Sequence, residues 1–321
     1  MTTVRDWAWG THRRPTEPPV MRRPAVYLVA AATVLALGAN WPIMAAGVEL
    51  VPPLWLAAMR VAGAAAVVTI VLGLARGMQR PARQDRPVVL SVGLAHLALV
   101  TGLVFLALEI VAPGRSAIVV YTSALWAVPM AAVVLHEHPT PRRIAGVALG
   151  CAGLVLLLEP WSLAWRDART IAGIAMLLLA AVANAGTSVH VRAHRWAGSP
   201  LALMPWQLIV AAVPLTLLAW AIEGPPRVPW EPTTIAIVAY QVVLGSAFGL
   251  WGLLTVGRSM PAVTTNLAFM AVPVVGLATS VAFTEEPLTV TVLAALVLVL
   301  VGVGIGLWSD RTTVPQVTAT P

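Results

Sequence analysis

Apolar residues fill ten long stretches of the chain, and short segments rich in arginine, proline and glycine separate them. The first stretch runs from Ala25 to about Val48, which is long enough for a helix to cross a hydrocarbon core of about 30 Å. Because nine more stretches follow it, we interpret it as a retained span and not as a cleaved signal. The others lie at about 53–75, 88–110, 116–135, 143–159, 171–190, 201–222, 233–256, 261–283 and 287–308. The pattern predicts ten transmembrane helices.

One segment of the chain occurs twice. The sequence from Leu106 to Pro139 returns 148 residues later, from Leu254 to Pro287. In both copies a turn with proline comes before an apolar run, and a Glu-x-Pro sequence follows it. Three pairs coincide without a gap: Pro113 with Pro261, Glu137 with Glu285, and Pro139 with Pro287. A sequence that repeats itself with such a period is built from two copies of one unit.

The number of spans in each copy determines how the copies are oriented. Each copy contains five predicted spans, and because five is odd the second copy enters the membrane upside down relative to the first. Inverted repeats are a common basis for alternating access, with the substrate site between the halves near the midplane. We therefore expect an all-α membrane protein with ten transmembrane helices in two inverted five-helix repeats. The predicted repeats occupy 25–159 and 160–308, between a disordered cytoplasmic tail at 1–24 and a cytoplasmic tail at 309–321.

Composition agrees with a membrane protein. Hydrophobic residues make up 59% of the chain and charged residues only 10%, whereas an ordinary soluble domain is about one quarter charged. The basic residues are all arginine, and 15 of the 20 fall on the side of the membrane that holds the N-terminal tail, against four on the other side. This bias predicts that both termini are cytoplasmic and that the protein crosses the cytoplasmic membrane many times. The basic balance thus has a topological origin, and we expect no nucleic-acid partner.

The chain resembles the EamA family of the drug/metabolite transporter superfamily over about 25–308. The resemblance is carried by Asn40-Trp41, the segment Pro53 to Arg60, Gly-Arg-Ser-Ala-Ile at 114–118, Glu137-His-Pro-Thr with Arg143 and Gly146, and Glu285-Glu-Pro. It implies a carrier for amino acids, other small metabolites or drugs, working by exchange or proton antiport. The chain departs from the family pattern at Leu125, where the second copy has Pro273, while Pro129 follows four residues later. This departure predicts a displaced kink in the fourth span.

Arg60 is the one full charge well inside a predicted span. It follows Pro53 by seven residues, which places it about 10 Å below the outer boundary. It is a candidate for binding a substrate carboxylate in a central cavity. The alternative is an arginine that extends to the outer surface or pairs with Glu49 or Glu109.

A histidine near mid-depth is the candidate for proton coupling. His96 lies nine residues into the third span, and a histidine titrates near neutral pH. It is equally consistent with a neutral, hydrogen-bonded core residue. No aspartate or glutamate lies at mid-depth, so Glu109 is the only other proton-coupling candidate.

Uncharged polar and aromatic residues are scattered over spans of both halves. Each must face protein or water, because an unsatisfied polar group in hydrocarbon is costly. A shared substrate cavity explains the set, and hydrogen bonding between helices is the alternative for any single residue. The candidate cavity residues, besides Arg60 and His96, are Asn40, Trp41, Tyr121, Asn184, Gln207, Tyr240, Gln241, Trp251 and Asn266.

Several other motifs have structural interpretations. Glu137 and Glu285 each lie beside a proline at a span end, where a carboxylate stabilises the start of the next helix. His136 and His138 flank Glu137, and His190 and His194 lie one helical turn apart. Each pair is too small for the three or four ligands of a metal site, so we expect no metal. Three Gly-x-x-x-Gly motifs, which begin at 146, 245 and 302, predict close helix packing, either within the bundle or in a homodimer.

The function that follows is secondary transport of a small metabolite, such as an amino-acid-like compound or a drug, by efflux. The competing classes are an intramembrane enzyme and a channel or sensor scaffold. The sequence has no Gly-x-Ser-x-Gly, no His-Glu-x-x-His and no phosphate-binding loop, so neither an enzyme nor ATP-driven transport is indicated, and we expect no cofactor. The polar residues do not form the repeated rings that a channel requires. The expected partners are the substrate and the lipid bilayer.

Overall fold

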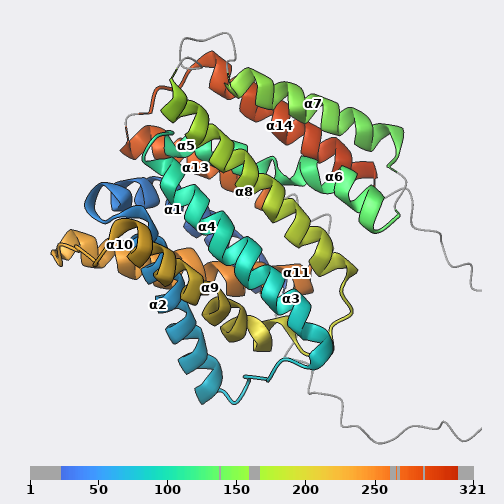
Figure 1. Ribbon diagram of the computed structural model, residues 1–321. Coiled ribbons are helices and arrows are strands. Elements are labelled where there is room, and N and C mark those ends of the chain that lie inside the picture. The colour runs from blue at the N-terminus through green and yellow to red at the C-terminus, as the bar shows by residue number, and fades with distance from the viewer. Residues whose placement is uncertain are drawn as a thin grey trace, which may run out of the picture.

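The described part of the protein is helical. The computed structural model describes residues 23–136, 139–158, 167–260, 265, 268–284 and 286–309 (Figure 1). Glu137, Glu285 and Asn266 therefore lie outside the described residues. The helical elements are α1 (Arg23–Leu50), α2 (Pro53–Leu74), η1 (Arg83–Asp85), α3 (Arg86–Ser91), η2 (Val92–Val100), α4 (Thr101–Leu108), α5 (Pro113–Tyr121), α6 (Ser123–Val134), α7 (Pro141–Leu158), α8 (Ala168–Ala193), α9 (Pro200–Glu223), α10 (Pro232–Val242), η4 (Val243–Phe248), α11 (Gly249–Ser259), α13 (Ala271–Phe283) and α14 (Val290–Ser309).

The length and composition of these helices suit a bilayer. Eight helical segments of the described chain are long and apolar enough to cross a membrane, and two shorter apolar helices, Ala271–Phe283 and Val290–Ile305, follow them. Large apolar side chains such as Leu28 and Val133 are more than 70% exposed on the outside of the bundle. A helix bundle with an apolar exterior is stable in lipid, not in water. The chain is a multi-pass membrane protein.

Prolines define where many of the spans begin. Pro53, Pro113, Pro200 and Pro232 each lie at the first position of a helix, where proline lacks only an N–H group that would have no partner inside the helix. At the other end of α9, Gly224 has a φ of 74° and a ψ of −157°, a backbone conformation that glycine adopts at little cost and that ends the helix.

The fourth span of each copy is broken at the same point in the repeat. The chain leaves regular helix at Thr122, between α5 and α6, and at Met270, just before α13. The two residues have almost the same backbone angles, with φ near −60° and ψ of −9° and −19°, and they are 148 positions apart. The Thr122 hydroxyl donates to the carbonyl of Val119 at 2.6 Å, which supports the break. The break therefore lies at the same place in both copies although their prolines differ, and the displaced kink expected from Pro129 stays a prediction.

The third span of each copy contains a π-helical segment. These segments are η2 in the first copy and η4 in the second, and a shift of 148 residues superposes η4 on the second half of η2. A π segment widens the helix by one residue per turn and leaves carbonyl groups with poor or missing partners, so such segments are frequent at functional sites.

The two copies pack against each other through equivalent helices. α7 runs along α14, as Figure 1 shows, and α2 runs along α9. The contact between α1 and α13 has a counterpart in the contact between α8 and the pair α5–α6. The buried core lies where the halves meet, with Phe105 and Leu208 fully enclosed.

Glycines permit the closest of these contacts. A Cβ atom at Gly302 would lie 2.5 Å from the backbone oxygen of Gly146 and 2.7 Å from the nitrogen of Gly150. At Gly249 it would lie 2.7 Å from the side chain of Leu37 on α1. The glycine motifs therefore serve packing within one chain, which is the first of the two interpretations considered for them.

Candidate functional site

Arg60 extends from α2 across to the other half of the protein. Its Nε donates to Ser246 Oγ at 2.7 Å, its Nη2 donates to the carbonyl oxygen of Gly245 at 3.0 Å, and its Nη1 lies 3.0 Å from Met44 Sδ. The guanidinium carbon lies 5.8 Å from the centre of the Phe105 ring, a cation–π arrangement. These contacts are all to neutral groups, and neither Glu49 nor Glu109 is among them.

The π segment η4 explains how Arg60 finds an acceptor inside the membrane. Gly245 and Ser246 both belong to η4, where the normal helical ladder is disturbed. Within this segment the Gly245 carbonyl and the Ser246 hydroxyl both accept from a side chain of another helix. Gly245 also allows Asn40 to approach, because a Cβ atom there would lie 2.6 Å from Asn40 Oδ1.

Two amide side chains beside Gly245 lack hydrogen-bond partners. Asn40 is 4% exposed, and its Oδ1 has no partner among the described residues. Gln241 is fully buried, and neither its Oε1 nor its Nε2 has a partner in the described chain. Each unsatisfied buried group costs about 1–3 kcal/mol. Such groups are typical of a site that awaits a polar ligand or water.

His96 lies in the other π segment, η2, and faces the same region. Its ring interacts with the side chain of Asn184 from α8, and it is within electrostatic range of Arg60. The Asn184 Nδ2 donates to Ser123 Oγ at 3.2 Å, and His96 Nδ1 has no partner in the described part of the chain. The structure therefore gathers Asn40, Arg60 and Gln241 around Gly245 of η4. His96 of η2, which interacts with Asn184, lies within electrostatic range of Arg60, and these five residues form the buried cluster.

The remaining candidates have other surroundings. Trp41 is buried against Gly276, Tyr121 is half-buried at the end of α5, and Gln207 is buried in α9. The Tyr240 hydroxyl donates to the carbonyl of Ala36 at 2.9 Å, and the Trp251 ring packs on Phe248. Glu109 is exposed at the end of α4. Of these residues, Tyr240 has a visible structural role, and Glu109 lies outside the buried cluster.

The residues that complete the cluster could not be recognised from the sequence. Ser246 and Met44 are common in apolar helices, and Gly245 was noticed only for packing. The spacing of a π segment differs from that of an α-helix by one residue per turn, so a helical period places these groups on the wrong face. Their contact with Arg60 depends on how α2 packs on η4, which sequence alone does not specify.

Three carboxylates outside this cluster connect the two halves, and the sequence analysis missed all of them. Glu223, at the end of α9, accepts from the backbone nitrogens of Leu54 and Trp55 at 2.8 and 3.0 Å. Glu286 accepts from those of Gly114 and Arg115 at 2.8 and 3.1 Å. Both contacts satisfy free N–H groups at the start of a helix in the other half, where negative charge is favoured.

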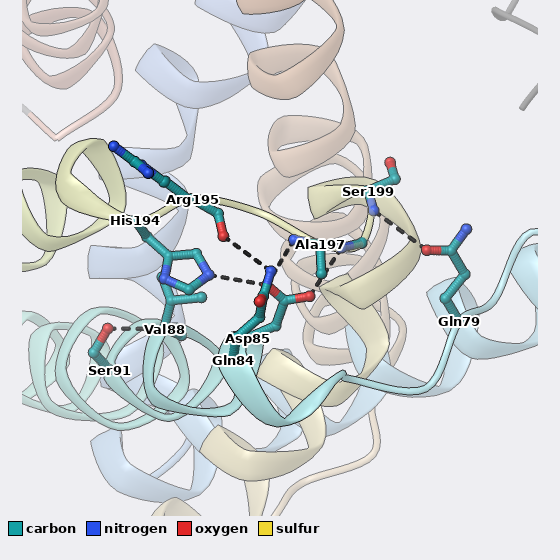
Figure 2. Close-up of polar contacts among 10 residues, drawn as sticks. Gln79, Gln84, Asp85, Val88, Ser91, His194, Arg195, Ala197 and Ser199 are labelled. Carbon is teal, nitrogen blue, oxygen red and sulfur yellow. Dashed lines mark hydrogen bonds and ion pairs between the residues drawn. The ribbon is translucent and has the colours of Figure 1, made fainter. Parts of the chain in front are cut away.

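The third carboxylate, Asp85, makes the network in Figure 2. Its two oxygens accept from the backbone nitrogens of Ala197 and Gly198 at 3.0 and 2.9 Å, and one of them lies 2.9 Å from His194 Nε2. Gln79 reinforces the connection by accepting from the backbone nitrogen of Ser199. The network joins the chain after α2 in the first half to the connection between α8 and α9 in the second.

Comparisons with known proteins agree with the two-copy organisation. The model of the EamA-like transporter family matches twice, at residues 24–159 and 171–307. A solved structure with the description "Crystal structure of protein" matches with a TM-score of 0.61 over 91% of this chain and all of that one, at 21% identity. At that identity the likeness supports the fold alone.

Curated relatives are described as transporters. An uncharacterized transporter of Bacillus subtilis (strain 168), YvbV, is 24% identical over 84% of this chain and 87% of its own length. A "Probable amino-acid metabolite efflux pump" of Salmonella typhimurium (strain LT2) is 26% identical over 80% of this chain and 86% of its own length. These matches span most of each protein, so the likeness concerns the whole transporter.

Proposed function

The chain belongs to the EamA-like transporter family, and from this premise we propose that it is a secondary carrier that exports a neutral amino acid or a similar zwitterion across the cytoplasmic membrane by alternating access. The family establishes a transporter of small molecules and not an enzyme. The name of the Salmonella relative supports both an amino-acid-like cargo and the outward direction. The polar residues of the buried cluster around Arg60 support a cargo that carries both an ammonium group and a carboxylate.

The contacts between the halves support an inverted arrangement. If the spans alternate from a cytoplasmic N-terminus, the start of α2 and the end of α9 both lie at the outer face, and Glu223 connects them. The same count places Asp85 and the α8–α9 connection together at the inner face. Each half thus anchors the other at opposite faces, as expected for two inverted units that rock around a central site.

One observation carries the proposal for the cargo, namely the unpartnered amides of Asn40 and Gln241 beside Arg60. The free oxygens of the two amides can accept from an ammonium group. The Gln241 Nε2 and the N–H groups of Arg60 beyond its three observed contacts can donate to a carboxylate. The set therefore matches a molecule that carries both groups on neighbouring atoms.

The apolar surroundings suit an uncharged side chain. Phe105 lies under the Arg60 guanidinium, and Trp41 and Tyr121 belong to or pack against the core between the halves. A pocket with a few polar groups and aromatic walls orients a small ligand by its polar end. We therefore expect amino acids with apolar side chains to be preferred.

Counterflow in proteoliposomes tests this function. Unlabelled phenylalanine inside the vesicles should drive saturable entry of labelled phenylalanine, and leucine should compete. Phenethylamine, which lacks the carboxylate, and 3-phenylpropionate, which lacks the amine, should compete at least about tenfold more weakly, because each loses charge-assisted hydrogen bonds. Equal competition by all three compounds contradicts the zwitterion site, and absence of saturable exchange for neutral amino acids contradicts the cargo.

A pair of neighbouring residues provides a matched control. Gln241→Leu keeps the size of the side chain but removes both free polar groups, so phenylalanine exchange should fall at least about tenfold. Tyr240→Phe removes a hydroxyl that is already used by the Ala36 carbonyl, so the half-saturation concentration should stay unchanged. Equal losses in both variants would assign the effect to general damage of α10 and not to the site.

A further inference from the structure

Glu286 is a buried carboxylate in the connection between α13 and α14. It is 5% exposed, and it accepts from two backbone nitrogens at the start of α5 in the other half of the protein. The approach requires a glycine, because a Cβ atom at Gly114 would lie 2.6 Å from Glu286 Oε2 and 2.8 Å from the side chain of Leu277. The contact is therefore built by both halves.

The charges around Glu286 are few. Arg115, on α5, is the charged group of the described chain whose field acts on the Glu286 carboxylate. Its neighbour Glu285 lies outside the described residues. Burial raises the pKa of Glu286, and the two backbone N–H groups and Arg115 oppose that rise. A glutamate with a raised pKa takes up a proton at a milder acidity than an exposed one.

The helix that Glu286 holds is a separate short unit. α5 begins at Pro113 and ends at Tyr121, where the break at Thr122 separates it from α6. Its far end carries Tyr121, one of the candidate cavity residues, which packs against the core between the halves. A change in the contact at the start of α5 can thus be transmitted to the core between the halves through one helix of nine residues.

We propose that Glu286 is the proton-binding group that couples this carrier to protons. A proton from the outer side binds one carboxylate oxygen and leaves a neutral carboxylic acid, which holds the helix start less strongly than the anion. α5 then separates from α13, and the outer face opens toward the site. This inference rests on the proposed function. His96 and Glu109 are the other candidates for the proton-binding group, and variants of each residue distinguish the three.

A buried thiol reports on the opening without any knowledge of the cargo. Ser280 lies on α13, one turn beyond Leu277, and is fully buried. In a Cys151→Ala background, Ser280→Cys places a single buried thiol on α13, the helix that precedes Glu286. At pH 8 its reaction with a membrane-impermeant maleimide should be slow in the parent and at least about tenfold faster with Glu286→Gln, because the amide lacks the charge that strengthens the two hydrogen bonds.

Lowering the pH from 8 to 5.5 should raise the labelling of the parent but not that of Glu286→Gln. Rates are divided by those of Ala168→Cys, an exposed position, to remove the effect of pH on thiol reactivity. Asp167→Asn is the matched control, since Asp167 is also a carboxylate at a helix start but is exposed and binds only its own half. It should behave like the parent.

Three outcomes overturn the proposal. The first is a parent whose normalised labelling does not change with pH, a measurement that needs no folded Gln variant. The second is Glu286→Gln with the parent's rate and pH profile. The third is faster labelling at pH 8 and loss of the pH response in Glu223→Gln, His96→Ala or Glu109→Gln, with Glu286→Gln behaving like the parent. Counterflow at equal pH on both sides tests the carrier separately, so exchange without pH-dependent opening refutes only the role of Glu286.

Discussion

A single methyl group placed at Gly245 should separate folding from transport. In Gly245→Ala the added Cβ atom would lie 2.6 Å from Asn40 Oδ1 and 3.4 Å from Gln241 Oε1. The first distance is too short for any carbon–oxygen contact, so Asn40 must move. The methyl group therefore occupies the space between the two amide oxygens that we assign to the substrate ammonium.

The effects of this substitution on stability nearly cancel. Alanine stabilises a helix interior by about 1 kcal/mol relative to glycine. Overpacking in a tight interior costs about 1–3 kcal/mol, and the end of a side chain can yield more easily than backbone. The free energy of unfolding should therefore fall by no more than about 2 kcal/mol. The loss of one or two hydrogen bonds to an ammonium costs about 1.5–3 kcal/mol each, which is at least about a tenfold rise in the half-saturation concentration.

Thermal unfolding in detergent and phenylalanine counterflow measure the two effects side by side. Gly257→Ala, in the same span, is the control, because a Cβ atom there would have no atom within 4 Å. It should gain stability from helix propensity alone and keep its exchange. If Gly245→Ala exchanges phenylalanine with the half-saturation concentration of the parent, the space beside Gly245 does not hold the substrate, and our assignment of Asn40 and Gln241 is refuted.

Other substitutions test the remaining parts of the structure. Gly302→Ala should destabilise the protein strongly, since its Cβ atom would lie 2.5 Å from the backbone oxygen of Gly146. Gly304→Ala is the control and should be nearly neutral, because the nearest atom to its Cβ belongs to a methionine side chain 3.8 Å away. Equal unfolding temperatures for the two variants would contradict the packing of α7 on α14. Arg60→Gln should lower phenylalanine exchange at least about tenfold, and unchanged exchange removes it from the site. Asp85→Asn should lower the unfolding temperature by a few degrees through its lost contacts with the α8–α9 connection, and a parent-like midpoint in repeated melts would show that this network is dispensable.

The fold was largely predictable because its main determinants are local. A run of apolar residues bounded by proline specifies a span by itself, and the starts at Pro53, Pro113 and Pro200 follow directly from the sequence. The repeat also implies that a feature of one copy recurs in the other. The break at Thr122 was harder to predict, since it depends on a hydroxyl-to-carbonyl bond and not on Pro129, which α6 includes without interruption.

The candidate site was predictable only in part. Burying a polar side chain in an apolar span costs free energy, so polar residues at such positions are candidates for a site. Asn40, Arg60 and Gln241 could be selected from the sequence on this basis. Their mutual arrangement could not, because it depends on the π segment that exposes the Gly245 carbonyl. The carboxylates that join the halves were missed for a related reason. Glu286 looks like a loop residue, and its partners lie more than 170 positions away.

The differences between the copies point to where the chemistry resides. Both copies contain the π segment and the broken fourth span. In the rocking mechanism that we propose, these shared features would let the two halves exchange roles. The charges do not repeat. Arg60 has Gln207 at the equivalent place, seven residues after the proline that starts the helix, and only the second copy has a second acid, Glu286, after its Glu-x-Pro glutamate. A symmetric pair of arginines would bind an anion equally from both faces, whereas the single Arg60 of the proposed site would hold the cargo in one orientation. The single Glu286 would likewise place the proposed proton-sensitive contact at one face of the membrane only.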